Sequence, residues 1–140
     1  MRIIWVFVVA VALSLGGYRA QAQEVVPPEP DIEAVIAEQI EAFRVDDFGT
    51  AFGFASPGIQ RMFGSPERFG AMVRDGYPMV WRPGEVNFGL LREVDDTLWQ
   101  EVLITDQAGR RFGLAYRMEQ IDGDWRIGGV QVIPAPDVAV

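Results

Sequence analysis

Apolar residues recur every three or four positions in the first half of the chain, which is the repeat of an amphipathic helix. The clearest run lies between positions 31 and 46. Asp31 follows Pro30 and is a suitable N-cap, so the pattern predicts a helix from Asp31 to near Asp46. The apolar stripe of this helix consists of Ile32, Val35, Ile36, Ile40 and Phe43.

Three shorter helices are predicted before residue 77. The first begins at Asp47, the second runs from Ser56-Pro57 to Gly64, and the third runs from Ser65-Pro66 to Gly76. Serine before proline is typical of a helix start, because the serine caps free amides and proline fits the first helical position.

Beyond residue 76 the apolar residues alternate, which is the period of a β-strand. The alternation predicts four or five strands, at 77–82, 86–94, 98–105, 111–121 and 125–133. Short turns such as Pro83-Gly84 and Asp122-Gly123 separate them, as in an antiparallel meander. Helices followed by such strands predict an α+β fold with the helices packed on one face of the sheet.

Glycines inside the predicted strands indicate a curved sheet. Gly89, Gly113 and the pair Gly128-Gly129 lie inside three of these strands. Glycine in a strand interior commonly marks a bend or bulge. We therefore expect the sheet to wrap around the helices as a cone.

The N-terminus differs from the rest of the chain. Residues 3–15 form a run that is apolar apart from Ser14 and follows Arg2, and Ala20-Gln21-Ala22 matches the small-x-small pattern of a signal peptidase site. As a helix the run would rise only about 20 Å, short of a membrane core of about 30 Å. We predict a signal peptide over residues 1–22, a periplasmic or secreted mature protein, and no membrane insertion after cleavage near Ala22.

The mature chain is expected to form a single α+β domain over residues 31–134. Residues 23–30 are rich in proline, so we expect an extended lead-in that only separates the cleavage site from the domain. Pro134 and Pro136 should end the last strand and leave residues 135–140 as a frayed tail.

Composition narrows the chemistry and the partners. Without Arg2 and Arg19 the chain keeps 10 basic and 20 acidic residues, a net charge of −10, so nucleic acid is not expected as a partner. Histidine, cysteine and lysine do not occur in the sequence. This excludes a histidine-based triad, a thiol nucleophile, a Schiff-base lysine and a His- or Cys-ligated zinc. We expect no cofactor and no metal, and any catalysis would use a carboxylate with tyrosine or arginine.

A run of residues between Phe43 and Pro83 resembles a known family. The quoted residues are Phe54 to Gly64 (FASPGIQRMFG), Phe69, Met72-Val73, Gly76-Tyr77-Pro78 and Trp81-Arg82-Pro83. They resemble the exported bacterial family labelled domain of unknown function 4864, and more broadly the nuclear transport factor 2-like cone fold. The resemblance implies helices that close the open end of a curved antiparallel sheet. It implies no reaction, because that superfamily includes isomerases, hydratases, epoxide hydrolases and non-catalytic modules.

Resemblance to the isomerase-type members implies a carboxylate and a tyrosine inside the cone, for which Glu101 and Tyr116 are the catalytic candidates. Glu101 shares its strand face with Trp99. The interpretation we favour places Glu101 on the solvated outer face, because carboxylates are rarely buried without a partner. Tyr116 equally suits an ordinary core position. Under the favoured interpretation the core opposite Glu101 consists of Leu98, Val102 and Ile104.

Ligand-binding candidates come from aromatic and polar residues near the predicted mouth of the cone. If Arg92 points inward it would hold an anion bidentately, and if not its stem would cover apolar surface. The adjacent carboxylates Asp46 and Asp47 suit a helix end followed by an N-cap better than a paired-carboxylate site. The ligand-binding candidates are Gln60, Arg61, Tyr77, Trp81, Arg92 and Trp99.

Two functions are compatible with these residues. The one we favour is a non-catalytic module that binds a small apolar or weakly acidic ligand in its cone or docks a protein partner. A homodimer through the sheet is implied by the resemblance. The alternative is a cofactor-free isomerase, hydratase or hydrolase that uses Glu101 or an aspartate as base, with Tyr116 or Arg92 as its partner. A carboxylate inside the cavity would favour the enzyme.

Overall fold

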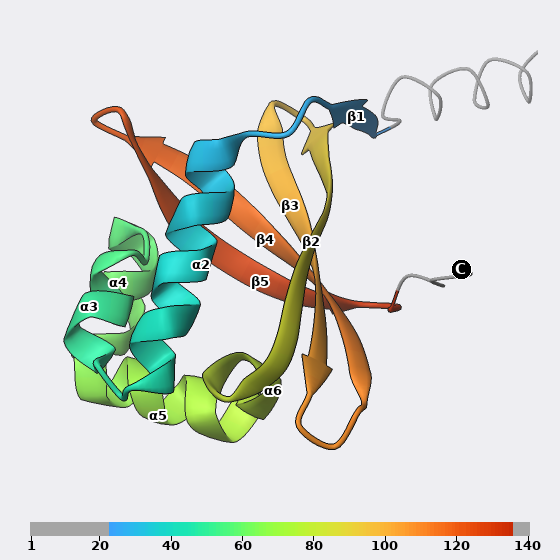
Figure 1. Cartoon of the computed structure of the whole chain (residues 1–140). Coiled ribbons are helices and arrows are strands. Elements are labelled where there is room, and N and C mark those ends of the chain that lie inside the picture. The colour runs from blue at the N-terminus through green and yellow to red at the C-terminus, as the bar shows by residue number, and fades with distance from the viewer. Residues whose placement is uncertain (1–22, 136–140) are drawn as a thin grey trace, which may run out of the picture.

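A computed structural model describes residues 23–135. The predicted signal peptide and positions 136–140 of the predicted tail lie outside these residues. Helices cover one face of a five-stranded antiparallel sheet of order β1-β2-β3-β4-β5, which confirms the α+β, cone-like prediction (Figure 1). The elements are β1 (Glu24–Val26), α2 (Pro30–Arg44), α3 (Phe48–Gly53), α4 (Pro57–Phe63), α5 (Pro66–Gly76), α6 (Pro78–Trp81), β2 (Pro83–Val94), β3 (Thr97–Asp106), β4 (Arg111–Ile121) and β5 (Asp124–Ile133).

The apolar stripe of α2 supplies much of the core. Ile32, Ile36 and Ile40 are at most 2% exposed, as expected for residues on one face of an amphipathic helix. The predicted N-cap is wrong, because Glu29 caps α2 and Pro30 occupies its first turn. Asp31 therefore lies inside the helix, where a carboxylate still interacts favourably with the N-terminal dipole.

The predicted caps of the short helices are confirmed. Asp47, Ser56 and Ser65 accept hydrogen bonds from the first-turn amides of α3, α4 and α5. Gly64 ends α4 with a φ of 80°, a backbone conformation that glycine adopts without strain. The Asp46–Asp47 pair is thus a helix end followed by an N-cap.

The predicted strand at 77–82 is wrong, because this segment contains α6. Pro78 starts the helix, and the Trp81 indole donates a hydrogen bond of 2.8 Å to the Asp46 carboxylate. That contact between distant segments outweighs the β-propensity of the local sequence. The predicted turn at Pro83-Gly84 is instead the start of β2.

The expectation that residues 23–30 only form a spacer is also wrong. Glu24–Val26 forms β1 and pairs antiparallel with β2, Val25 opposite Arg92. No helix within residues 23–135 is long and apolar enough to cross a membrane.

Two of the predicted bends in the sheet are confirmed. The pairing of β2 with β3 shifts register between Phe88 and Leu91, around Gly89. The pairing of β4 with β5 shifts between Arg117 and Met118, opposite Gly128. Gly113 pairs regularly and marks no bulge.

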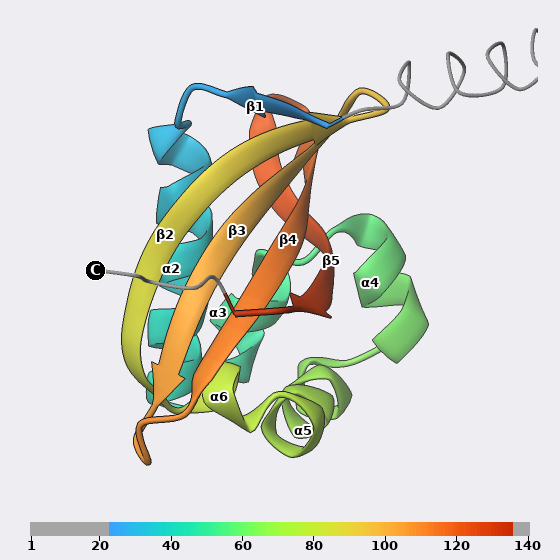
Figure 2. The same ribbon diagram turned by 90° about the vertical axis from the view of Figure 1, so that its right-hand side faces the viewer.

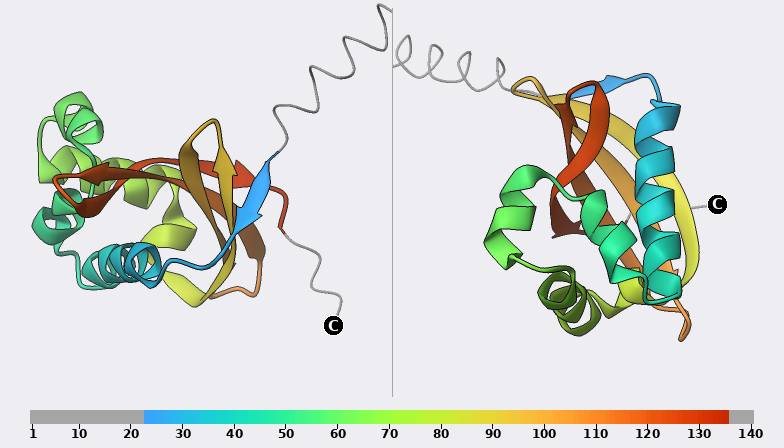
Figure 3. Two further views of the ribbon diagram at one scale, coloured as in Figure 1. Left: turned by 90° about the horizontal axis from the view of Figure 1, so that it is seen from above. Right: turned by 90° about the vertical axis from the view of Figure 1, so that its left-hand side faces the viewer.

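The two faces of the sheet have different surroundings. Figure 2 looks onto the outer face, over which no helix of the described residues lies. The right-hand view of Figure 3 looks from the helical side and shows α2 along one side of the helical layer and α4 on the other.

Candidate functional site

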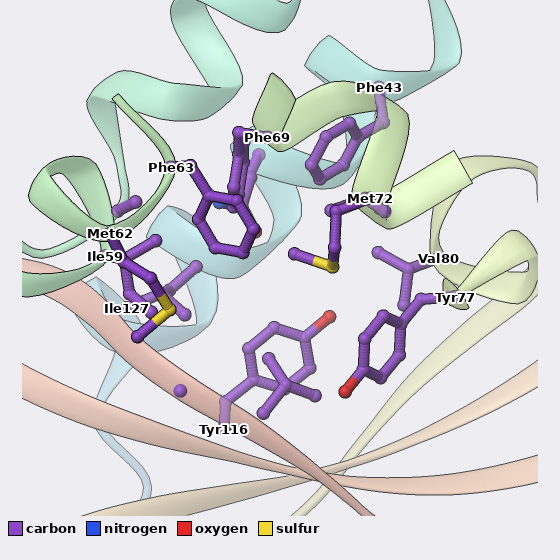
Figure 4. Close-up of a pocket in the computed structure, with 15 residues that line it drawn as sticks. Phe43, Ile59, Met62, Phe63, Phe69, Met72, Tyr77, Val80, Tyr116 and Ile127 are labelled. Carbon is purple, nitrogen blue, oxygen red and sulfur yellow. The ribbon is translucent and has the colours of Figure 1, made fainter. Parts of the chain in front are cut away.

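A cavity of about 290 Å³ lies between the inner face of the sheet and the helices α4, α5 and α6 (Figure 4). Apolar side chains from the helices form its roof and those of β4 and β5 form its floor. The lining residues are Gln39, Phe43, Ala55, Ile59, Met62, Phe63, Phe69, Met72, Val73, Tyr77, Val80, Tyr116, Ile127, Gly129 and Val130.

Packed aromatic rings form one wall of the cavity. The Phe69 ring centroid lies 5.8 Å from that of Phe43 and 5.7 Å from that of Phe63, within the range of favourable ring contacts. Phe43 and Phe69 are buried, whereas no residue of α4, which carries Phe63, is fully buried. The cavity therefore has a buried aromatic side, formed by Phe43 and Phe69, and a less buried side under α4.

Three polar side chains, Gln39, Tyr77 and Tyr116, take part in this lining. The Gln39 amide nitrogen donates a hydrogen bond of 3.1 Å to the carbonyl of Ala51. The Tyr116 hydroxyl is buried and has no hydrogen-bond partner among the described residues. Burial raises the pKa of Tyr116, and the nearby Tyr77 adds to this effect, so the Tyr116 hydroxyl keeps its proton.

No charged side chain lines the cavity. Arg92 and Glu101 lie on the outer face, where the Arg92 guanidinium is 2.6 Å from the Glu101 carboxylate. Register explains this placement: Gln100 pairs with Tyr116 and faces the helices, so its neighbour Glu101 faces away from them. The structure thus brings Arg92 and Glu101 together, but on the opposite face from Tyr116.

The two tryptophan candidates also lie outside the cavity lining. Trp99 pairs with Arg92 and Arg117 on the outer face. The Trp81 indole donates a hydrogen bond to the Asp46 carboxylate, and the Arg82 guanidinium stacks 3.9 Å from the centre of the Trp81 ring. Among residues 23–135, no cluster of three acidic side chains is arranged to hold a metal ion.

The two ligand-binding candidates on α4, Gln60 and Arg61, do not line the cavity. The Gln60 amide donates to the carbonyls of Phe52 and Ala55, at 3.0 and 3.2 Å, and so fastens α4 to the end of α3. Arg61 is exposed on α4. Of all the candidates, the structure therefore brings Tyr77 and Tyr116 to the cavity.

Two buried glutamines, Gln39 and Gln100, were not predicted from the sequence. Gln39 lines the cavity, and Gln100 donates to the carbonyls of Gly89 and Glu101, at 3.1 and 2.9 Å, where the β2 bulge interrupts the strand pairing. Their positions in the apolar pattern of the sequence could have indicated that they are buried. Gln39 adjoins the apolar stripe of α2, and Gln100 alternates with Leu98 and Val102.

Comparison with known proteins gives a family for this chain. The profile of the family described as "Domain of unknown function (DUF4864)" matches residues 26–140. The chain belongs to this family. In this DUF4864 domain, the matched region includes every element that lines the cavity. No curated protein and no solved structure matches the chain.

Proposed function

We propose that this domain is a non-catalytic module that binds a small, neutral, mainly apolar ligand in the cavity beneath α4. The observation that carries the proposal is the cavity of about 290 Å³ lined almost entirely by apolar side chains. Ligand pockets start at about 300 Å³ and are lined mainly by hydrophobic and aromatic groups. A core filled by its own side chains would not contain a space of this size.

The lining favours a neutral ligand over an acidic one. A carboxylate that enters an apolar site loses its hydration and needs a cation as a replacement. Of the two arginine candidates for that role, Arg92 is paired with Glu101 on the other face of the sheet, and Arg61 does not line the cavity. We therefore expect an apolar ligand and not a weakly acidic one.

The enzyme alternative has less support from the geometry. A general base must lie within hydrogen-bond reach of the proton that it removes, and no carboxylate lines the cavity. Glu101 cannot act on a molecule held beside Tyr116, because the sheet separates them.

Two further expectations about the protein stay predictions. They are the homodimer through the sheet and the periplasmic or secreted location. N-terminal sequencing of the protein from its host tests the second, with Gln23 as the expected first residue.

Naphthalene is a suitable probe for the proposed binding, because it is neutral, apolar and fluorescent. We expect saturable binding to the purified protein and loss of binding in Val130→Phe, which places a ring in the cavity. Val132→Phe is the matched control. Val132 lies two residues further along β5, is 59% exposed and does not line the cavity.

Equilibrium dialysis measures the naphthalene affinity of both variants, and thermal unfolding checks that both are folded. The test is the difference between their two affinities. If the wild-type protein binds no naphthalene, or if both variants bind it equally well, the cavity is not the binding site.

A further inference from the structure

The edge of the sheet at β5 is occupied only along its first part. The Ile127 amide donates to the carbonyl of Phe54, and the Ile127 carbonyl accepts from the amide of Ser56, both at 2.8 Å. The segment before α4 thus pairs with β5 in the manner of a short parallel strand. Beyond Ile127, β5 continues to Ile133 as the last strand of the sheet, and Figure 2 shows no strand beside this part on the side away from β4.

The backbone groups of Val130 and Val132 point toward this open edge. The partners of Ile127, Val130 and Val132 on β4 are every second residue from Met118 to Leu114. Backbone groups two residues apart on a strand point the same way, so Val130 and Val132 share the outward orientation of Ile127. Among the described residues, neither makes a backbone hydrogen bond beyond the pairing with β4.

The sequence of this edge lacks the usual protection against strand pairing. Residues 127–133 (IGGVQVI) contain no charge and no proline, and the Val132 side chain is 59% exposed. Charged residues and prolines on edge strands commonly prevent association. The opposite edge has both, because β1 begins with Glu24 and is followed by Pro27-Pro28. The β5 edge is therefore open to pairing with an extended chain.

The cavity reaches the surface beside the same edge. The Val130 side chain lines the cavity, while the backbone of this residue faces the edge. Met62 on α4 also lines the cavity and is 72% exposed, and Figure 4 shows it on the side of Ile127. A residue paired beside Val130 would direct its inner-face side chain under α4 into the cavity. Since about 150 Å³ holds one benzene ring, a cavity of about 290 Å³ admits a large apolar side chain.

We propose that β5 binds an extended segment of a partner protein, which adds a strand to the sheet at Val130 and Val132 and places an apolar side chain in the cavity. Main-chain hydrogen bonds supply the affinity and the cavity supplies the selectivity, as in other cases of strand addition. This inference rests on the proposed function, because the same cavity receives the apolar group, and it names a protein as the source of that group.

The short open length of the edge favours a peptide segment over a second copy of the chain. Residues 129–133 extend over about 17 Å, enough for one short strand. A stable dimer has an interface of about 1,600 Å², of which pairing over so short a length covers only a small part. A second copy would also offer Val130, whose side chain already lines its own cavity, and would leave both cavities empty.

A fluorescent peptide of alternating threonine and valine, with a central leucine and a lysine at each end, is the probe. The lysines suit the net charge of −8 of the chain. We expect saturable binding in fluorescence polarisation and competition by naphthalene. Binding should weaken at least about tenfold when serine replaces the leucine, because serine leaves the cavity unfilled.

Two substitutions of Val132 separate the contribution of the backbone from that of the side chain. Val132→Pro removes the outward amide and keeps the pairing with β4, since proline is accepted at such edge positions. Peptide binding should weaken about tenfold. Val132→Ala keeps the amide and should lose much less. Naphthalene should bind to both variants as to the wild type, because Val132 does not line the cavity, and thermal unfolding checks that both are folded.

Two N-methylated peptides test the main-chain hydrogen bonds directly. One carries methyl groups on the amides of its leucine and valines, and the other carries them on the amides of its threonines. Only one of these alternating sets of amides faces β5 in a paired strand. One peptide should therefore lose binding and the other should keep it.

The outcomes distinguish this inference from the proposed function. Equal binding of the two methylated peptides, or no peptide binding by a wild-type protein that binds naphthalene, would overturn the inference while the proposed function stands. A wild-type dimer that Val132→Pro converts to a monomer would overturn it in favour of a second copy at this edge. If naphthalene does not bind and serine replaces leucine without loss, the cavity takes no apolar group and the proposed function fails as well.

Discussion

The two sides of the helical layer are packed to different degrees. In the first half of α2, Ile32 and Ile36 are 0% exposed and pack into the core, whereas Gln39 and Phe43 in its second half line the cavity. Along α4 no residue is fully buried, and Met62 is 72% exposed although its side chain also lines the cavity. One layer of helices therefore combines a solid part with a hollow part.

The difference indicates where stability and binding reside. Burial and close packing supply most of the folding free energy, so the α2 side should hold the domain together. The α4 side forgoes some of that packing and keeps space for a ligand. Substitutions on the α2 side and on the α4 side test this difference in packing.

The largest effect is expected from equivalent truncations on the two sides. Ile36→Ala should lower the free energy of unfolding by about 2–5 kcal/mol, because it creates a void in a filled core. Ile59→Ala on α4 should lower it by about 1 kcal/mol, since Ile59 is half-buried beside an existing cavity. Urea unfolding measures both values. Equal losses would show that α4 is packed as tightly as α2 and would remove the distinction.

A smaller effect is expected where α5 meets the solid part of the layer. A methyl group at Gly70 would overlap the ring of Phe48 on α3, so Gly70→Ala should destabilise the protein by about 1–3 kcal/mol. Gly76→Ala, on the same helix with open space around it, is the control and should be neutral or slightly stabilising. If Gly70→Ala were neutral, the α3–α5 contact would belong to the loosely packed part.

The smallest effect is expected where α6 is attached to the end of α2. Helix α6 carries Val80, which lines the cavity. The Trp81 indole and then the Arg82 guanidinium hold the pKa of Asp46 below its usual value. A lowered folded-state pKa contributes stability that is present above the unfolded pKa of about 3.9 and is lost as the pH falls through the folded value.

Asp46→Asn should therefore lower the thermal midpoint more at about pH 6 than at a pH below the lowered pKa of Asp46, where the wild-type carboxylate is itself protonated. Trp81→Phe removes the first donor and should reduce the same pH dependence. A difference that does not change with pH would show that the Asp46 charge does not hold α6 in place.

The sequence was most informative where local patterns decide the structure. The α2 stripe, the serine and aspartate caps and the strands after residue 83 follow from periodicity and side-chain hydrogen bonding. The elements that it missed depend on distant partners. β1 exists through its pairing with β2, and α6 is fixed by the contact between Trp81 and Asp46.

The site could be predicted only in part, because alternation does not tell which face of a strand is inner. On β3 both faces carry large apolar residues, Trp99 and Leu103 on one and Leu98 and Val102 on the other. The position of Gln100 at the β2 bulge comes from contacts between strands. Neither the volume of the cavity nor the isolation of the Tyr116 hydroxyl leaves any trace in the sequence.

The way in which α4 is attached has a kinetic consequence. The helix is held at its start by the Ser56 cap and the Gln60 amide, and it ends at the left-handed Gly64. Because it buries no residue fully, α4 can leave its place at a far smaller free-energy cost than global unfolding. If a molecule binds in the cavity, we expect local opening of α4 to contribute to its release, whereas the lifetime of the folded domain depends on the core packed against α2.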